Sequence, residues 1–167
     1  MVPIFLVALF DGGGHDAAAR IAAWAVFAVA CLTDRFDGVL ARNYGMATEF
    51  GAFVDPIADK ALIGSALVAL SILGDLPWWV TIVILVRELG VTLLRLAVIR
   101  RGVIPASRGG KLKTLTQAVA IGLFILPLSG LLHVVAVWVM GLAIVLTVVT
   151  GIDYVVEAVR DVRHTRA

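Results

Sequence analysis

Long apolar stretches separated by short polar segments are the feature that most constrains this chain. Six of them can be distinguished, at residues 2–10, 17–33, 52–73, 78–99, 115–128 and 133–150. Hydrophobic residues make up 61% of the sequence, whereas soluble domains average about 45–50% apolar residues. We therefore expect an all-α polytopic membrane protein, a bundle of six transmembrane helices that forms a single domain over residues 1–167.

The first apolar stretch is too short to cross a membrane by itself. Residues 2–10 comprise nine positions, and a spanning helix needs about 20. We expect this first helix to be truncated at its N-terminus in the present sequence. The segment Asp11–Gly12–Gly13–Gly14 that follows predicts a turn, because no strand and helix surround the glycines as they would in a phosphate-binding loop.

The distribution of basic residues predicts the orientation of the bundle. Six spans place both termini on one side, and cytoplasmic segments are enriched in Lys and Arg. Arg20 is the one basic residue expected on the opposite side. We expect a multi-pass cell-membrane protein with both termini in the cytoplasm, since that side would carry Arg35, Arg42, Arg100, Arg101, Arg108, Lys111, Lys113, Arg160, Arg163 and Arg166. The formal net charge of only +2 gives no indication of a nucleic-acid partner.

Four aspartates lie close together in a chain that is otherwise mostly hydrocarbon. Asp34 and Asp37 are three residues apart, and Asp55 and Asp59 are four residues apart. On helices, both spacings put the two carboxylates of a pair on one face, so two successive helices could bring the pairs into one acidic pocket. Carboxylate oxygens are preferred ligands of hard cations such as Mg²⁺ and Mn²⁺. We therefore predict a divalent-metal site, and with it the active site, at the cytoplasmic face.

The stretch 33–60 resembles the signature of the CDP-alcohol phosphatidyltransferase family, D-x-x-D-G-x-x-A-R-x8-G-x3-D-x3-D. All eight fixed positions are present, as Asp34, Asp37, Gly38, Ala41, Arg42, Gly51, Asp55 and Asp59. The resemblance implies that Asp34, Asp37 and Asp55 hold two metal ions, Mg²⁺ or Mn²⁺. Asp59 would share in this binding and act as the general base. The resemblance also implies a homodimer, CDP-diacylglycerol as a substrate, and a CDP site formed by Asp34, Gly38, Ala41, Arg42 and Gly51.

Two further segments resemble phosphatidylglycerophosphate synthases, a group within this family. They are V-R-E-L-G at residues 86–90 and G-K-L-K-T-x-x-Q at residues 110–117. This resemblance implies that the acceptor alcohol is sn-glycerol 3-phosphate and that cytidine monophosphate (CMP) is released. Residues 100–113 are expected to form a basic loop, and the candidates for binding the acceptor phosphate are Arg108, Lys111, Lys113 and Arg87. For Arg87, an equally supported interpretation is that Arg87 and Glu88 form an internal ion pair with other helices.

Other functions stay open at this point. Within the same chemistry, the chain could be a cardiolipin synthase of the CDP-alcohol type, with phosphatidylglycerol as acceptor, or a phosphatidylinositol-phosphate synthase. A cation or proton transporter is an alternative from a different class. Transport would favour acids near the middle of the membrane and inverted repeats, whereas the four aspartates are expected near one face. Membrane lipids are expected partners, and the motifs imply no organic cofactor.

Overall fold

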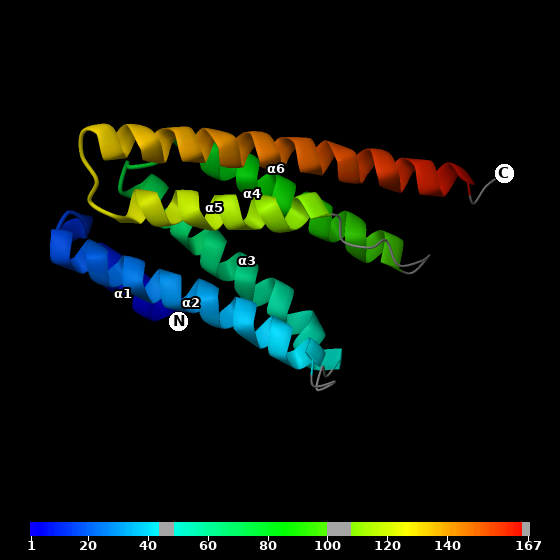
Figure 1. Ribbon diagram of the computed structural model, residues 1–167, viewed down its shortest axis with the longest axis horizontal. Helices are drawn as coiled ribbons and strands as arrows, with labels where there is room; N and C mark the ends of the chain where they lie inside the picture. Colours follow the sequence, from blue (N-terminus) through cyan, green and yellow to red (C-terminus); the bar gives the residue numbers. More distant parts are fainter. Residues whose placement is uncertain (44–48, 100–107, 165–167) are drawn as a thin grey trace.

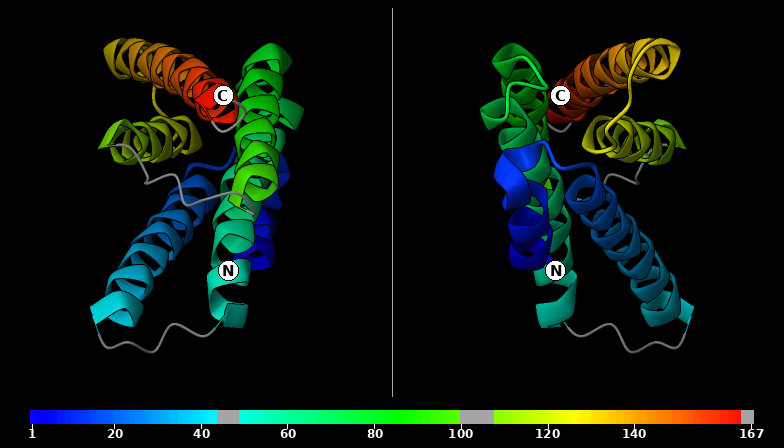
Figure 2. Two further views of the ribbon diagram at one scale, coloured as in Figure 1. Left: turned by 90° about the vertical axis from the view of Figure 1, so that its right-hand side faces the viewer. Right: turned by 90° about the vertical axis from the view of Figure 1, so that its left-hand side faces the viewer.

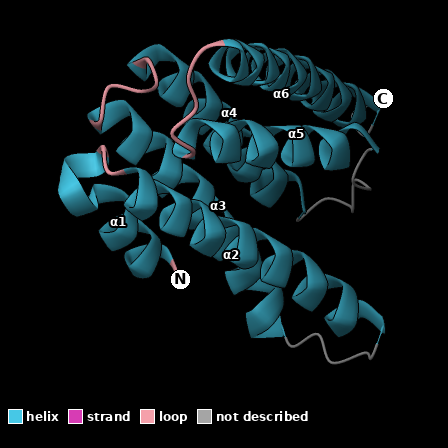
Figure 3. Ribbon diagram, turned by 60° about the vertical axis from the view of Figure 1, so that its left-hand side comes forward, coloured by secondary structure: helices cyan, strands magenta, loops and turns pink. Residues whose placement is uncertain are grey.

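The computed structural model of the chain describes the backbone of residues 1–43, 49–99 and 108–164 and the side chains of residues 1–33, 60–94 and 112–156. Over the described residues the fold is all-helical, as predicted, and contains six α-helices and one short 3-10 helix (Figure 3). The elements are α1 (Val2–Phe10), η1 (Asp11–Gly14), α2 (Ala17–Asn43), α3 (Glu49–Ile72), α4 (Trp78–Ile99), α5 (Arg108–Ile125) and α6 (Leu131–His164).

The helices run back and forth between two ends of an elongated bundle. The connections α1–α2, α3–α4 and α5–α6 lie at one end (Figure 1). The end of α2, the start of α3, the end of α4, the start of α5 and the end of α6 lie at the other end. Helix α6 packs along α5 and α4, and α3 contacts α1, α4 and α5. The ribbons of α2 and α3 spread apart toward the end where residues 44–48 join them (Figure 2).

Several helix boundaries differ from those expected. Helix α4 has the predicted bounds, but α5 begins at Arg108, so the prediction that residues 108–113 belong to a loop was wrong. Helices α2 and α6 continue to Asn43 and His164, well past the ends of their apolar stretches. Hydrophobicity marks where a helix is buried or lipid-facing, whereas polar residues of good helix propensity continue the helix beyond its apolar stretch. No proline interrupts the polar ends of α2 and α6.

The core lies where α1, α2 and α3 meet and continues between α3, α4 and α5. Phe5 and Leu9 of α1 are fully buried, and the Phe5 ring lies 5.7 Å from that of Phe27 on α2, centroid to centroid. The turn predicted after α1 is confirmed as the 3-10 segment η1. Its last glycine, Gly14, has a φ of +78°, and an added Cβ would lie only 2.3 Å from Cδ2 of Leu73. A side chain there is therefore excluded both by backbone conformation and by packing.

A buried ion pair closes the end of the bundle that contains η1. Arg20, near the start of α2, is 7% exposed, and its guanidinium pairs with Asp75 in the α3–α4 connection. The same end contains a hydrogen bond of 2.7 Å between the hydroxyls of Ser71 and Thr81. Arg20 was expected to be an external topology residue, but it instead joins α2 to the chain between α3 and α4.

Part of the bundle has the surface of a membrane protein. Among the described residues, one helix contains a stretch long and apolar enough to cross a membrane by length and composition, at Leu131–Val156 of α6. Large apolar side chains project outward from this helix, with Leu131 80% and Trp138 77% exposed. Apolar surface of this extent is unusual for a soluble monomer. The described residues thus contain six α-helices, but the membrane criterion is met by one of them.

Candidate active site

The residues of the family signature lie on two consecutive helices at one end of the bundle. Asp34 and Asp37 belong to the second half of α2, and Asp55 and Asp59 belong to the first half of α3. These segments lie at the end where the five residues 44–48 join the two helices (Figure 1). The side chains of these aspartates, and of the predicted nucleotide contacts Gly38, Ala41, Arg42 and Gly51, lie outside the described residues. Their convergence into one metal site therefore stays a prediction.

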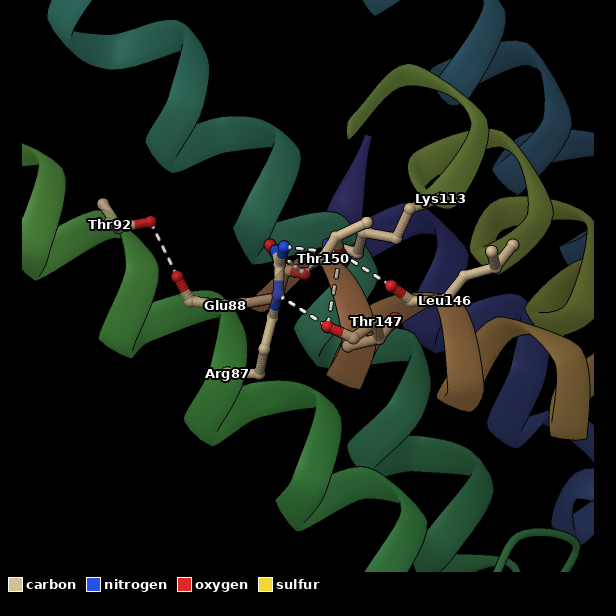
Figure 4. Close-up of polar contacts among 7 residues, drawn as sticks. All are labelled: Arg87, Glu88, Thr92, Lys113, Leu146, Thr147 and Thr150. Atoms are coloured by element: carbon tan, nitrogen blue, oxygen red, sulfur yellow. Dashed lines mark hydrogen bonds and ion pairs between the residues drawn. The ribbon is translucent and has the colours of Figure 1, made fainter. Parts of the chain in front are cut away.

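A second group of polar side chains is described in detail and lies between α4, α5 and α6. It consists of Arg87 and Glu88 on α4, Lys113 on α5, and Thr147 and Thr150 on α6 (Figure 4). Charged side chains amid apolar helices are unfavourable unless they are paired, and they commonly mark functional sites. Within the described side chains, no three His, Cys, Asp or Glu residues come close enough to hold a metal ion. The group contains two cationic side chains, Arg87 and Lys113, and one carboxylate, Glu88, so its charge suits an anion.

Arg87 is fastened to the neighbouring helix α6. Its Nε donates a hydrogen bond to the backbone oxygen of Thr147 at 3.0 Å, and its Nη2 donates to Oγ1 of Thr150 at 2.8 Å (Figure 4). The Thr150 hydroxyl in turn donates to the backbone oxygen of Leu146 at 2.6 Å. Gly151 leaves room for this side chain, because an added Cβ would lie 3.1 Å from Cγ of Arg87. Contacts of this kind fix the guanidinium between the two helices.

Glu88 links Arg87 to Lys113. Its Oε1 accepts a hydrogen bond from Nη1 of Arg87 at 3.3 Å and also forms an ion pair with Nζ of Lys113. The Lys113 side chain is 4% exposed and the Glu88 side chain 18% exposed. The predicted internal ion pairing with another helix is confirmed for Glu88. Its partner Lys113 was not named from the sequence, because the two residues are 25 positions apart on different helices.

A small cavity opens beside this ion pair, between α3, α4 and α5. Its volume is about 60 Å³. It has two lysines and one glutamate in an otherwise mostly apolar wall. Lys60, which follows Asp59 directly in the sequence, contributes to this wall, so the cavity lies next to the segment that carries the predicted base. The lining residues are Lys60, Ile63, Gly64, Leu85, Glu88, Leu89, Lys113, Thr114 and Gln117.

The predicted acceptor-binding residues occupy two places. Lys113 lines the cavity, and Arg87 lies one residue before the cavity residue Glu88. Arg108 and Lys111 belong to the first turns of α5, but their side chains lie outside the described residues. Sequence reasoning assigned no role to Lys60 and gave Glu88 only a part in an internal ion pair. The available signal was the occurrence of a charged residue inside an apolar helix.

Comparison with known proteins assigns the chain to a family. Residues 1–149 match the family described as CDP-alcohol phosphatidyltransferase. The chain belongs to this family, as its signature predicted.

Named relatives from bacteria agree with this assignment. A protein of Mycobacterium tuberculosis (strain ATCC 25618 / H37Rv), named probable phosphatidylglycerophosphate synthase, is 78% identical over 166 residues, which cover 99% of this chain and 79% of the relative. The CDP-diacylglycerol–glycerol-3-phosphate 3-phosphatidyltransferase of Bacillus subtilis (strain 168) is 36% identical over 174 residues, which cover 92% of this chain and 86% of the relative. The Escherichia coli (strain K12) protein of the same name is 42% identical over 106 residues, which cover 60% of this chain and 58% of the relative.

Proposed function

We propose that this protein transfers the phosphatidyl group of CDP-diacylglycerol to sn-glycerol 3-phosphate, giving phosphatidylglycerophosphate and CMP. The observation that carries the proposal is the complete eight-position signature, distributed over two successive helices at one end of the bundle. The names of the relatives that are 78% and 36% identical support the same activity. A cation or proton transporter, the alternative from a different class, finds no support in these comparisons.

The donor set on α2 and α3 fits two hard divalent cations. Asp34, Asp37, Asp55 and Asp59 supply only carboxylate oxygens, and in our proposal they would hold two Mg²⁺ or Mn²⁺ ions. When bound, such ions neutralise the charge of a pyrophosphate and orient its leaving group. Four carboxylates close together would repel one another without positive charge between them, which is a further reason to expect cations here.

In the proposed reaction, Asp59 accepts the proton of the attacking hydroxyl group of glycerol 3-phosphate. The hydroxyl oxygen then forms a bond to the lipid-bearing phosphorus, the bond from that phosphorus to the bridging pyrophosphate oxygen breaks, and CMP leaves. A base positioned for such a transfer contributes about 10²–10⁴-fold to the rate. The transfer is direct and requires no covalent enzyme intermediate.

The nucleotide would bind between α2 and α3. Gly38, Ala41 and Gly51 are small, so a nucleotide can approach the helix backbone closely. Arg42 offers a planar fork of donors suited to phosphate oxygens or base edges. Asp34 would contact the nucleotide as well as the metal ions.

The acceptor phosphate would bind near the cavity between α3, α4 and α5. Lys113 lines this cavity, and Arg87 is anchored beside it. Arg108 and Lys111 at the start of α5 would add positive charge. Several cationic side chains around one site suit the two negative charges of the phosphate group of glycerol 3-phosphate.

The proposed setting is the cell membrane, with six spans and with the active site and both termini in the cytoplasm. The alternation of helix direction between the two ends of the bundle supports this proposal (Figure 1), as does the apolar surface of α6. Among the described helices, the basic residues predicted for the cytoplasmic side belong to segments at the end where α2 and α3 are joined, namely Arg35, Arg42, Arg108, Lys111, Lys113, Arg160 and Arg163. A homodimer is proposed from the family resemblance.

The test is CMP release from CDP-diacylglycerol with each acceptor in turn, in detergent or liposomes. We expect release with glycerol 3-phosphate and none above background with phosphatidylglycerol or inositol phosphate. Release with phosphatidylglycerol alone would make the protein a cardiolipin synthase. Release with inositol phosphate alone would make it a phosphatidylinositol-phosphate synthase. A divalent-metal requirement is checked by adding a chelator and then restoring Mg²⁺ or Mn²⁺.

A further inference from the structure

We propose that Glu88 is a positioning residue for the acceptor alcohol, because its carboxylate holds the ammonium group of Lys113 at the wall of the α3–α4–α5 cavity. The inference rests on the function proposed above and deepens it. Neither the sequence motifs nor the relatives' names give Glu88 a role, whereas Lys113 is a candidate for binding the acceptor phosphate.

The first argument is the chain of contacts that ends at Lys113. Arg87 is anchored on α6 through the backbone oxygen of Thr147 and the hydroxyl of Thr150. It donates a hydrogen bond to Oε1 of Glu88, and the same oxygen pairs with Lys113 on α5. Glu88 is therefore fixed on one side by a rigid partner and fixes Lys113 on the other.

The second argument is burial. The Lys113 side chain is 4% exposed, and a buried ammonium group without a counter-charge is strongly unfavourable. A lysine side chain also has many rotamers, and a partner that selects one of them reduces the entropy lost when a ligand binds. Replacing the carboxylate with a neutral group would remove the charge that orients Lys113 at the cavity wall. The ammonium group would then be held less well where the acceptor phosphate binds.

The third argument is location. Glu88 and Lys113 line the same cavity as Lys60, which directly follows the proposed base Asp59. A phosphate entering this cavity would meet an ammonium group that is already oriented. In a competing role, Glu88 would only neutralise Lys113 until the acceptor binds. Removal of the Glu88 charge would then tighten acceptor binding, whereas the positioning role predicts weaker acceptor binding.

The test is a double-mutant cycle on the full chain in detergent, with Glu88→Gln, Lys113→Ala and the double variant. We expect Glu88→Gln to raise KM for glycerol 3-phosphate about tenfold and to change KM for CDP-diacylglycerol less than about threefold. In the Lys113→Ala background, the same substitution should change KM for glycerol 3-phosphate by less than about twofold, because Glu88 then has no ammonium group to orient. Tighter acceptor binding, equal losses for both substrates, or independent effects that multiply in the double variant would overturn the proposal.

Asp75→Asn is the matched control. It also removes the carboxylate of a buried ion pair, with Arg20, but at the opposite end of the bundle. It should lower the unfolding temperature without discriminating between the two substrates.

A wild-type chain without glycerol 3-phosphate-dependent CMP release would reject the proposed function. In that case the same variants are compared by how far inorganic phosphate raises their unfolding temperature, with CDP and Mg²⁺ present. Loss of this protection in Glu88→Gln would support the role of Glu88, and unchanged protection would overturn it.

Discussion

The guanidinium of Arg87 on α4 donates a hydrogen bond to the backbone oxygen of Thr147 on α6, 3.0 Å away. A side chain is thus fastened to the main chain of a helix 60 residues further on. Because a backbone oxygen does not move with a side-chain rotamer, this contact holds the Arg87 guanidinium in one position. It is the start of the series of contacts that leads through Glu88 to Lys113.

Gly151 is expected to be needed for this contact. An added Cβ would lie 3.1 Å from Cγ and 3.2 Å from Nε of Arg87, so Gly151→Ala must displace the arginine. Gly141 on the same helix has open space at its Cβ position, and Gly141→Ala should stabilise the protein by up to about 1 kcal/mol through helix propensity alone. Gly151→Ala should be less stable than Gly141→Ala by about 1–2 kcal/mol. Unfolding in detergent measures both, and equal stabilisation by the two substitutions would contradict the contact.

Asp75→Asn should destabilise the opposite end of the bundle. The substitution leaves the guanidinium of Arg20, which is 7% exposed, without its counter-charge. Because Asp75 is itself partly exposed, we expect a loss of about 2 kcal/mol in the free energy of unfolding. The double variant Arg20→Met/Asp75→Asn removes both charges and should recover most of this loss. A double variant no more stable than Asp75→Asn would show that the ion pair is not the source of the effect.

Asp59→Asn should abolish turnover while leaving nucleotide binding largely intact. Loss of a general base lowers kcat by about 10²–10⁴-fold. Stabilisation of the protein by CDP and Mg²⁺ should be partly retained, since three other carboxylates remain in the proposed metal site. Asp153→Asn, at an exposed position on α6, is the control and should keep full activity. Near wild-type turnover in Asp59→Asn would remove this residue as the base.

Lys111→Ala should weaken binding of the acceptor more than binding of the lipid substrate. We expect KM for glycerol 3-phosphate to rise about tenfold, because one cation is removed from the proposed phosphate site. KM for CDP-diacylglycerol should change little. The neighbouring Leu112 is 57% exposed, and Leu112→Ala serves as the control for local helix effects. Equal losses for both substrates in Lys111→Ala would place this lysine outside the acceptor pocket.

The helical fold was predictable because apolar segments of this length are compatible with few structures other than buried or lipid-facing helices. The ends of the helices were not, since polar residues continue a helix wherever the backbone is unbroken. Residues 100–113 were expected to form a basic loop, yet α5 begins at Arg108. Likewise, nothing local to Arg20 indicates Asp75 as its partner, because the two are 55 residues apart and meet only when the helices pack.

The candidate site was predictable to different degrees. The spacing of Asp34, Asp37, Asp55 and Asp59 predicted the family, and the family match over residues 1–149 confirms it. Lys113 was predicted from its motif to bind the acceptor phosphate, which stays a prediction, whereas its pairing with Glu88 depends on how α4 and α5 face each other. Sequence spacing describes neighbours on one helix and carries no information on contacts between helices.

Helix α6 has 34 residues, which at 1.5 Å per residue correspond to about 51 Å. The hydrocarbon layer of a bilayer is about 30 Å thick. A helix of this length placed across it would extend beyond the acyl chains, through the head-group zone and into water. Arg160 and Arg163 belong to the final turns. They would then lie at the level where anionic lipid head groups gather, close to the leaflet in which an anionic product would accumulate.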